Sequence, residues 1–152
     1  MRILIDADSC PKAAREMVLR FASRLKIIAI FYANRKIPGI PETQMVISSN
    51  DEGAADKLII KSALKDDLIL TRDLPLAESL VEAGNTVMDD RGRVFTCENI
   101  RELRSIRDFT VGLAESGLGI ERTASYGKKE LSSFANSLDR ELTRLKSQSA
   151  SG

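Results

Sequence analysis

The sequence contains no histidine, and this absence limits the chemistry that the chain can perform. Nucleophilic schemes of the serine–histidine and cysteine–histidine types are excluded because their base is an imidazole. The two cysteines, Cys10 and Cys97, lie far apart and lack a CxxC spacing, so the sequence offers no zinc-binding set. Any general base must therefore be a carboxylate, a lysine or a hydroxide bound to a metal ion.

Aromatic residues and long apolar runs are also scarce. Aromatics make up 5% of the chain and tryptophan is absent, so platforms on which nucleic-acid bases stack are few. The longest apolar run, residues 27–33, is much shorter than the roughly 18 residues that a membrane span needs. Asp6 and Asp8 interrupt any apolar segment near the N-terminus, which disfavours a secretory signal. We therefore predict a cytoplasmic protein that does not contact membranes.

The charges nearly balance, with a net charge of +1, which argues against tight nucleic-acid binding by bulk electrostatics alone. Hydrophobic residues make up 43% of the 152 residues, enough for one domain with a real core. We predict that this domain spans residues 1–146. The Ser-, Gln- and Gly-containing end, residues 147–152, is predicted to be a disordered tail.

Short apolar runs alternate with amphipathic segments along the chain. The runs predict five strands, at about residues 2–6, 26–32, 44–48, 67–71 and 85–88. Strands that alternate with helices are typical of an α/β fold, here a single three-layer Rossmann-like domain with a mostly parallel sheet. A last amphipathic helix is predicted over 128–146, and its apolar face packs either on its own domain or on a second subunit in a homodimer.

Carboxylates follow several of the predicted strands. Asp6 and Asp8 follow the first strand, Asp73 follows the fourth, and Asp56 begins the helix after the third. The carboxyl ends of parallel strands share one edge of the sheet, where open α/β folds place their sites. Like charges that meet there are costly to desolvate unless a cation lies between them. The pattern predicts a Mg²⁺ or Mn²⁺ site formed by these four aspartates, and chemistry on phosphate esters is a common use of such a site.

Each of these aspartates also has a structural interpretation. Asp6 is compatible with a buried salt bridge, and Asp8 or Asp73 with the N-cap of the helix that follows. Asp56 lies in a first helical turn, where the helix dipole favours a negative charge. Asp89 fits a tight turn as well as a site.

Three polar side chains near strand ends are candidates for contacts with substrate phosphate. They are Asn34, Arg35 and Arg91. A guanidinium group and an amide both donate hydrogen bonds to phosphate oxygens. The alternative is that all three are ordinary surface residues.

Several of these segments, taken together, resemble the YaiI/YqxD family of small bacterial proteins, which is similar to PIN-like nuclease domains. The segments are Ile5–Pro11 (IDADSCP), Ala33–Arg35, Ala54–Asp56, Asp67–Ala77 (DLILTRDLPLA) and Arg91–Thr96. The resemblance covers residues 1 to about 112, and the order of its first and fourth segments makes it specific.

The resemblance implies a PIN-like, Rossmann-type fold whose acidic cluster holds Mg²⁺ or Mn²⁺. Asp6 matches the aspartate of the first strand, Asp73 the one after the fourth strand, and Asp56 the acid carried by a helix, whereas Asp8 is an addition of this family. The chain departs from the pattern at Gly53, where many members carry an aspartate that Asp51 or Glu52 would replace. It departs again at Asp90, which stands where a proline is usual.

Three functions are compatible with the sequence. The first is a metal-dependent phosphodiesterase, or ribonuclease, that uses Asp6, Asp8, Asp56 and Asp73. The second is a phosphatase of the haloacid-dehalogenase type, in which Asp6 is the nucleophile, Asp8 the general acid and Thr71 the threonine at a strand end. The third is a regulatory module that binds RNA without cutting it.

Overall fold

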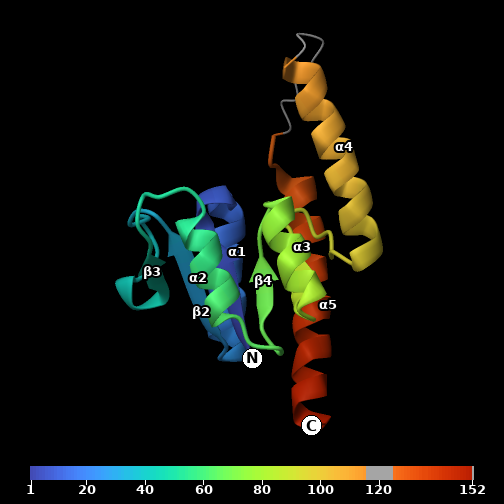
Figure 1. Cartoon of the computed structure of the whole chain (residues 1–152). Coiled ribbons are helices and arrows are strands. Elements are labelled where there is room, and N and C mark those ends of the chain that lie inside the picture. The colour runs from blue at the N-terminus through green and yellow to red at the C-terminus, as the bar shows by residue number, and fades with distance from the viewer. Residues whose placement is uncertain (116–124, 152) are drawn as a thin grey trace.

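The computed structural model describes residues 1–115 and 125–151 and contains one sheet of five parallel strands (Figure 1). The predicted domain, 1–146, therefore includes a stretch outside the described residues. In spatial order β3-β2-β1-β4-β5, the strands are β3 (Met45–Ile47), β2 (Ile28–Ala33), β1 (Arg2–Asp6), β4 (Leu68–Leu70) and β5 (Thr86–Met88). The prediction of an α/β fold with a parallel sheet is confirmed.

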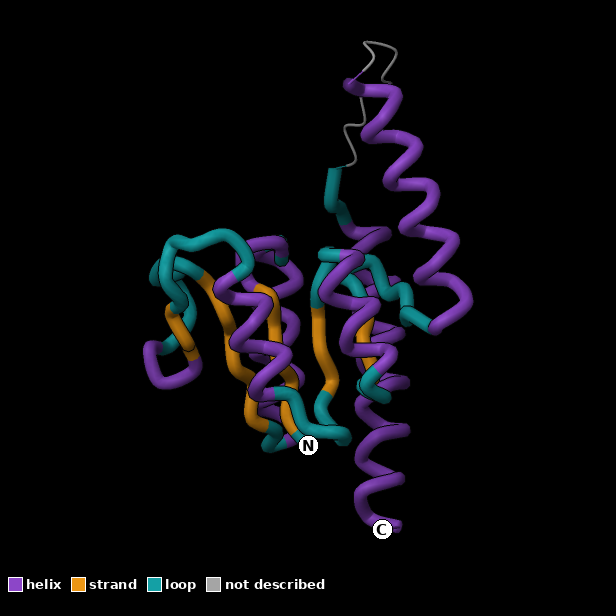
Figure 2. Tube along the Cα trace, viewed as in Figure 1, coloured by secondary structure: helices purple, strands orange, loops and turns teal. Residues whose placement is uncertain are grey.

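Helices cover both faces of the sheet, as the predicted three-layer architecture requires (Figure 2). On one face lie α1 (Lys12–Leu25) and α5 (Lys128–Ser151). On the other lie α2 (Ala54–Ser62) and α3 (Leu74–Glu82), with α4 (Cys97–Glu115) packed on α3. Two short 3₁₀ helices, η1 (Ala7–Ser9) and η2 (Glu42–Gln44), complete the secondary structure of the described chain.

The strands are apolar on both sides because helices bury both faces of the sheet. Alternate residues of β1 enter different cores: Ile3 and Ile5 face α1 and α5, whereas Leu4 faces α2 and α3. In β2, Phe31 and Tyr32 divide between the two cores in the same way. This arrangement explains why the runs read as continuous hydrophobic stretches.

The apolar side of α5 packs on its own domain. Phe134, Leu138, Leu142 and Leu145 are buried against α1 and the sheet. The helix continues to Ser151, although the sequence predicted a disordered tail from residue 147. No glycine or proline occurs between Lys128 and Ser151, so no residue in that segment forces the helix to end. The predicted homodimer stays a prediction.

The order of the strands reverses between β1 and β4. From β1 the chain passes through α1 to β2, and from β4 it passes through α3, on the opposite face, to β5. The two connections diverge, so a crevice is expected at the carboxyl ends of β1 and β4. Asp6 ends β1 and Asp73 lies at the start of α3, so the fold places both beside this crevice.

No helix within the described ranges combines the length and the apolar character that crossing a membrane requires.

Candidate active site

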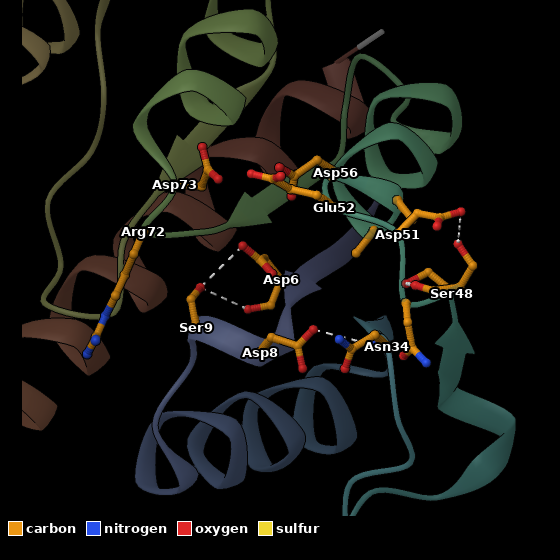
Figure 3. A pocket seen from close by; sticks show the side chains of 15 residues that line it. Asp6, Asp8, Ser9, Asn34, Ser48, Asp51, Glu52, Asp56, Arg72 and Asp73 are labelled. Carbon is orange, nitrogen blue, oxygen red and sulfur yellow. Dashed lines mark hydrogen bonds between the residues drawn. The ribbon is translucent and has the colours of Figure 1, made fainter.

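An open cavity of about 450 Å³ lies at the carboxyl edge of the sheet and is strongly acidic (Figure 3). All four aspartates of the predicted metal site line it. Its acidic lining residues are Asp6, Asp8, Asp51, Glu52, Asp56 and Asp73. The predicted convergence of carboxylates at one edge of the sheet is thus present in the fold.

Asp6 is the most buried of these carboxylates, with 7% of its surface exposed. Its Oδ2 accepts hydrogen bonds from Thr71 Oγ1 at 2.8 Å and from Ser9 Oγ at 3.2 Å. Burial raises its pKa, as do the charges of the nearby acidic groups, while the two hydroxyl donors lower it. No lysine or arginine of the described chain forms an ion pair with Asp6, so the interpretation as a structural salt bridge is wrong.

Asp73 both caps a helix and lines the cavity. Its Oδ1 accepts a hydrogen bond from the backbone N–H of Leu76 at 3.0 Å, which is the N-cap arrangement expected at the start of α3. Its own backbone N–H donates to Thr71 Oγ1 at 3.0 Å. Thr71 therefore joins the start of α3 to the Asp6 carboxylate.

Thr71 is a site residue that the metal hypothesis omitted, although the phosphatase alternative included it. Its hydroxyl bonds to Asp6, which is 65 residues away in the sequence. The signal for it was a hydroxyl residue directly after an apolar strand and two residues before Asp73.

Asp56 projects from the first turn of α2 and is half-buried. Burial is the largest cause that raises its pKa to about 6, followed by the negative charges of Asp73 and Asp6 and a hydrogen bond with Asp73. The repulsion among these carboxylates opposes ionisation of Asp56. Its position and its electrostatics both connect it to the same cluster.

Asp8 does not cap α1, whose N-cap is Pro11, and that interpretation of Asp8 is wrong. It lies in η1, and its Oδ2 accepts a hydrogen bond from the backbone N–H of Asn34 at 3.2 Å. The bond connects the segment after β1 to the segment after β2. Asp8 is solvent-exposed at the rim of the cavity, opposite Asp56 in Figure 3.

The residues predicted to contact phosphate separate in space. Asn34 lines the acidic cavity, whereas Arg35 is exposed and does not line it. Arg91 lines a different cavity, and its Nη1 lies 3.7 Å from Glu130 Oε1.

Asp89 is also outside the acidic cavity, and its Oδ1 accepts hydrogen bonds from the backbone N–H groups of Arg91 and Arg93, both at 2.9 Å. Its interpretation as a turn residue is confirmed.

The loop before α2 brings two more carboxylates to the cavity. Asp51 and Glu52 both line it, next to Gly53, which is the N-cap of α2 and has a φ of +75°. Asp51 Oδ2 accepts a hydrogen bond from Ser49 Oγ at 3.2 Å. Asp51 and Glu52 are the residues expected to replace the aspartate that is missing at position 53.

The acidic side chains of this cavity suit a hard divalent cation, because all of them offer carboxylate oxygens as ligands. Among the described residues, Arg72 is the one arginine that lines this cavity, and its side chain turns away from the carboxylates (Figure 3). It forms an ion pair with Asp90. Within residues 1–115 and 125–151, however, no three acidic or cysteine side chains lie together as a ready-formed metal site. The residues fit a metal ion in chemistry and charge, and ligation requires them to come closer together.

Comparison with known proteins identifies close relatives of the chain. A family model described as "Uncharacterized BCR, YaiI/YqxD family" matches residues 4–144. A UPF0178 protein of Treponema denticola is 45% identical over 139 residues, which cover 91% of this chain and 90% of the relative. A UPF0178 protein of Myxococcus xanthus is 42% identical over 149 residues, covering 95% of this chain and 96% of the relative. No solved structure matches the chain. The chain belongs to the YaiI/YqxD family, as its sequence motifs predicted.

Proposed function

We propose that this protein is a PIN-like, metal-dependent phosphodiesterase that cleaves RNA in the cytoplasm. The observation that carries the proposal is the convergence of Asp6, Asp8, Asp56 and Asp73 on one open cavity at the strand-order reversal. The four carboxylates come from three segments, namely the end of β1 with η1, the first turn of α2 and the start of α3. None of them forms an ion pair with a cationic side chain of the described chain. So many uncompensated negative charges favour a divalent cation as their partner.

Asp6, Asp8, Asp56 and Asp73 would hold Mg²⁺ or Mn²⁺, since both ions prefer oxygen ligands. When bound, such an ion lowers the pKa of a water molecule and stabilises negative charge on a phosphoryl group. Burial, followed by the charges of neighbouring aspartates, raises the pKa of both Asp6 and Asp56, and a bound cation would favour their ionised forms. We expect the ion to draw the carboxylates together.

The polar neighbours hold these carboxylates in position. Thr71 and Ser9 both donate to Oδ2 of Asp6, so Oδ1 is the oxygen that accepts no hydrogen bond from a described residue and is the better placed to bind an ion. In the metal-free protein, burial is the largest cause that raises the pKa of Asp56 to about 6, and a cation bound beside it would favour its ionised form. Asn34 offers a neutral amide to phosphate oxygens at the rim.

The phosphatase alternative receives less support from the cavity. A phosphatase that uses an aspartyl nucleophile needs a cation beside the phosphate, and the lining of the acidic cavity contains no lysine among the described residues. The hydrogen bond between Asp6 and Thr71 is compatible with either scheme. Turnover of p-nitrophenyl phosphate without any cleavage of RNA would favour the phosphatase.

The experiment is a cleavage assay with labelled single-stranded RNA, in Mn²⁺ or Mg²⁺ and in EDTA. We expect cleavage in metal only, and a loss of at least about a hundredfold in Asp6→Asn, which keeps the shape of the side chain but removes its charge. Asp139→Asn is the matched control, because Asp139 is exposed on α5 and lines none of the cavities described here. Cleavage that survives both chelation and Asp6→Asn would rule out the proposal.

Calorimetric titration of Mn²⁺ into the metal-free protein separates the nuclease from a module that only binds RNA. The nuclease requires binding at millimolar Mn²⁺ or tighter, and weaker binding in Asp6→Asn. RNA binding without any metal binding would favour the module.

A further inference from the structure

A second cavity, of about 430 Å³, adjoins the acidic one, and Arg72 lines both. We call it the arginine cavity. Its lining combines three arginines with apolar side chains and two buried aspartates: Arg72, Leu74, Asp89, Asp90, Arg91, Arg93, Phe95 and Leu103. The guanidinium group of Arg72 points away from the carboxylates of the acidic cavity (Figure 3).

Two of the three arginines are available to a ligand. Arg93 is exposed and forms no ion pair with any residue of the described chain. Arg91 has one partner, Glu130, at 3.7 Å, and an ion pair of this length at a partly exposed site contributes little free energy. Arg72 is committed to Asp90, to which its Nε donates at 2.7 Å.

Each of the two aspartates of this cavity accepts hydrogen bonds with one carboxylate oxygen, and Oδ1 of Asp90 is buried without a hydrogen-bond partner among the described residues. Asp89 Oδ1 accepts two backbone N–H groups of its own turn, and Asp90 Oδ2 accepts the Arg72 guanidinium. Both aspartates are buried, with 8% and 5% of their surface exposed. The cationic groups that line this cavity are therefore the guanidinium groups of Arg72, Arg91 and Arg93, and of these Arg72 is already paired with a buried aspartate.

The turn that carries Arg91 and Arg93 is held rigidly. Gly92 has a φ of +91°, and a Cβ placed on it would lie 2.5 Å from the carbonyl oxygen of Ser133. The backbone N–H of Gly92 donates to the carbonyl oxygen of Asp89. Because the turn is packed against α5, little backbone freedom is lost when the two arginines bind a ligand.

We propose that the arginine cavity binds a phosphate of the same RNA strand whose scissile phosphate lies in the acidic cavity. This inference rests on the proposed function and extends it to the substrate class, a single-stranded polynucleotide. Arg91 and Arg93 contact the neighbouring phosphate, since guanidinium groups match phosphate oxygens in geometry and charge. The half-buried side chains of Leu74 and Leu103 offer an apolar surface to the sugar or base.

The test measures binding of a fluorescent single-stranded RNA of about twelve nucleotides by anisotropy, in EDTA and over a range of salt concentrations. Arg93→Gln and the double variant Arg91→Gln/Arg93→Gln are compared with wild type. Each lost phosphate contact is expected to reduce the slope of log K against log salt by about 0.7 and to weaken binding several-fold at low salt. Arg93→Lys should keep the slope because it keeps the charge.

Arg20→Gln is the matched control: Arg20 is exposed on α1 and lines neither cavity, and its Nη2 lies 3.9 Å from the sulfur of Met17. If both glutamine variants keep the wild-type slope while wild type cleaves RNA in a metal-dependent way, the arginine cavity does not bind a phosphate of the RNA. The proposed function would then still stand. Reduced slopes without cleavage would support the cavity and overturn the nuclease. If wild type neither binds nor cleaves RNA, both proposals fail.

Discussion

Asp56→Asn is expected to stabilise the metal-free protein at neutral and alkaline pH. The pKa of Asp56 is raised from 3.8 to about 6, chiefly by burial and then by Asp73 and Asp6. Between these two values the unfolded chain releases a proton that the folded chain keeps, so the free energy of unfolding falls as pH rises. The penalty is absent below about pH 4 and complete above the folded-state pKa. Asparagine, which is never charged, avoids it.

The size of the effect follows from the shift and from the exposure of the side chain. A rise from 3.8 to about 6 corresponds to about 3 kcal/mol if none of it is screened. Asp56 is only half-buried, so screening by solvent reduces this to about 1 kcal/mol. Loss of the favourable interaction with the α2 dipole removes a few tenths of a kcal/mol. A stabilisation of about 1 kcal/mol corresponds to a rise of about 2–4 °C in Tm.

Thermal melts followed by circular dichroism, from about pH 4 to pH 8 in EDTA, provide the measurement. The difference in Tm between Asp56→Asn and wild type should open between about pH 4 and pH 6 and then level off. Millimolar Mn²⁺ should reverse it, because the ion stabilises only a protein that binds it. A variant that is no more stable than wild type at pH 8 in EDTA would show that burial and the neighbouring charges do not penalise ionised Asp56. Asp139→Asn is the reference for loss of an exposed carboxylate.

Three further substitutions test other parts of the structure. Asp67→Asn should lower the free energy of unfolding, measured in urea, by about 3 kcal/mol, because Asp67 is fully buried and accepts three hydrogen bonds from Arg2. A decrease below about 1 kcal/mol would contradict this. Gly92→Ala should cost at least about 2 kcal/mol more than Gly53→Ala, because only at Gly92 would the Cβ collide with a backbone atom, that of Ser133, and equal costs would count against the packing described. Gly53→Asp adds a carboxylate where a Cβ has open space, although the φ of +75° strains any residue other than glycine. If the variant keeps the wild-type fold by circular dichroism, calorimetry should show tighter Mn²⁺ binding, and unchanged or weaker affinity would argue against a metal in this cavity.

Much of the acidic site was predictable because its positions follow from the fold class. Asp6 and Asp73 adjoin strands that are recognisable as short apolar runs, and parallel strands bring their carboxyl ends to one edge. Asp56 begins a helix that leads away from the same edge. Each aspartate lies close in sequence to its strand or helix, so its position at the strand end can be predicted locally. The parallel arrangement of the strands then brings these ends together at one edge of the sheet.

Contacts between distant segments were not predictable in this way. The sequence did not indicate that Asp8 would accept a hydrogen bond from Asn34 instead of capping α1, or that Thr71 would hold Asp6. Arg91 follows a strand like the others, but the turn around Gly92 packs against α5 and carries it into the neighbouring cavity. Such contacts depend on how segments far apart in the chain pack together.

The sequence by itself determined the parallel α/β layering and the edge at which the carboxylates collect, because hydrophobic periodicity and the alternation of strands with helices are short-range patterns. Only the tertiary structure decided which carboxylates lack a cationic partner and which arginines face a separate cavity. Ion pairs and cavities arise between side chains whose separation is set by the packing of several helices on one sheet. No pattern within a single segment encodes that separation.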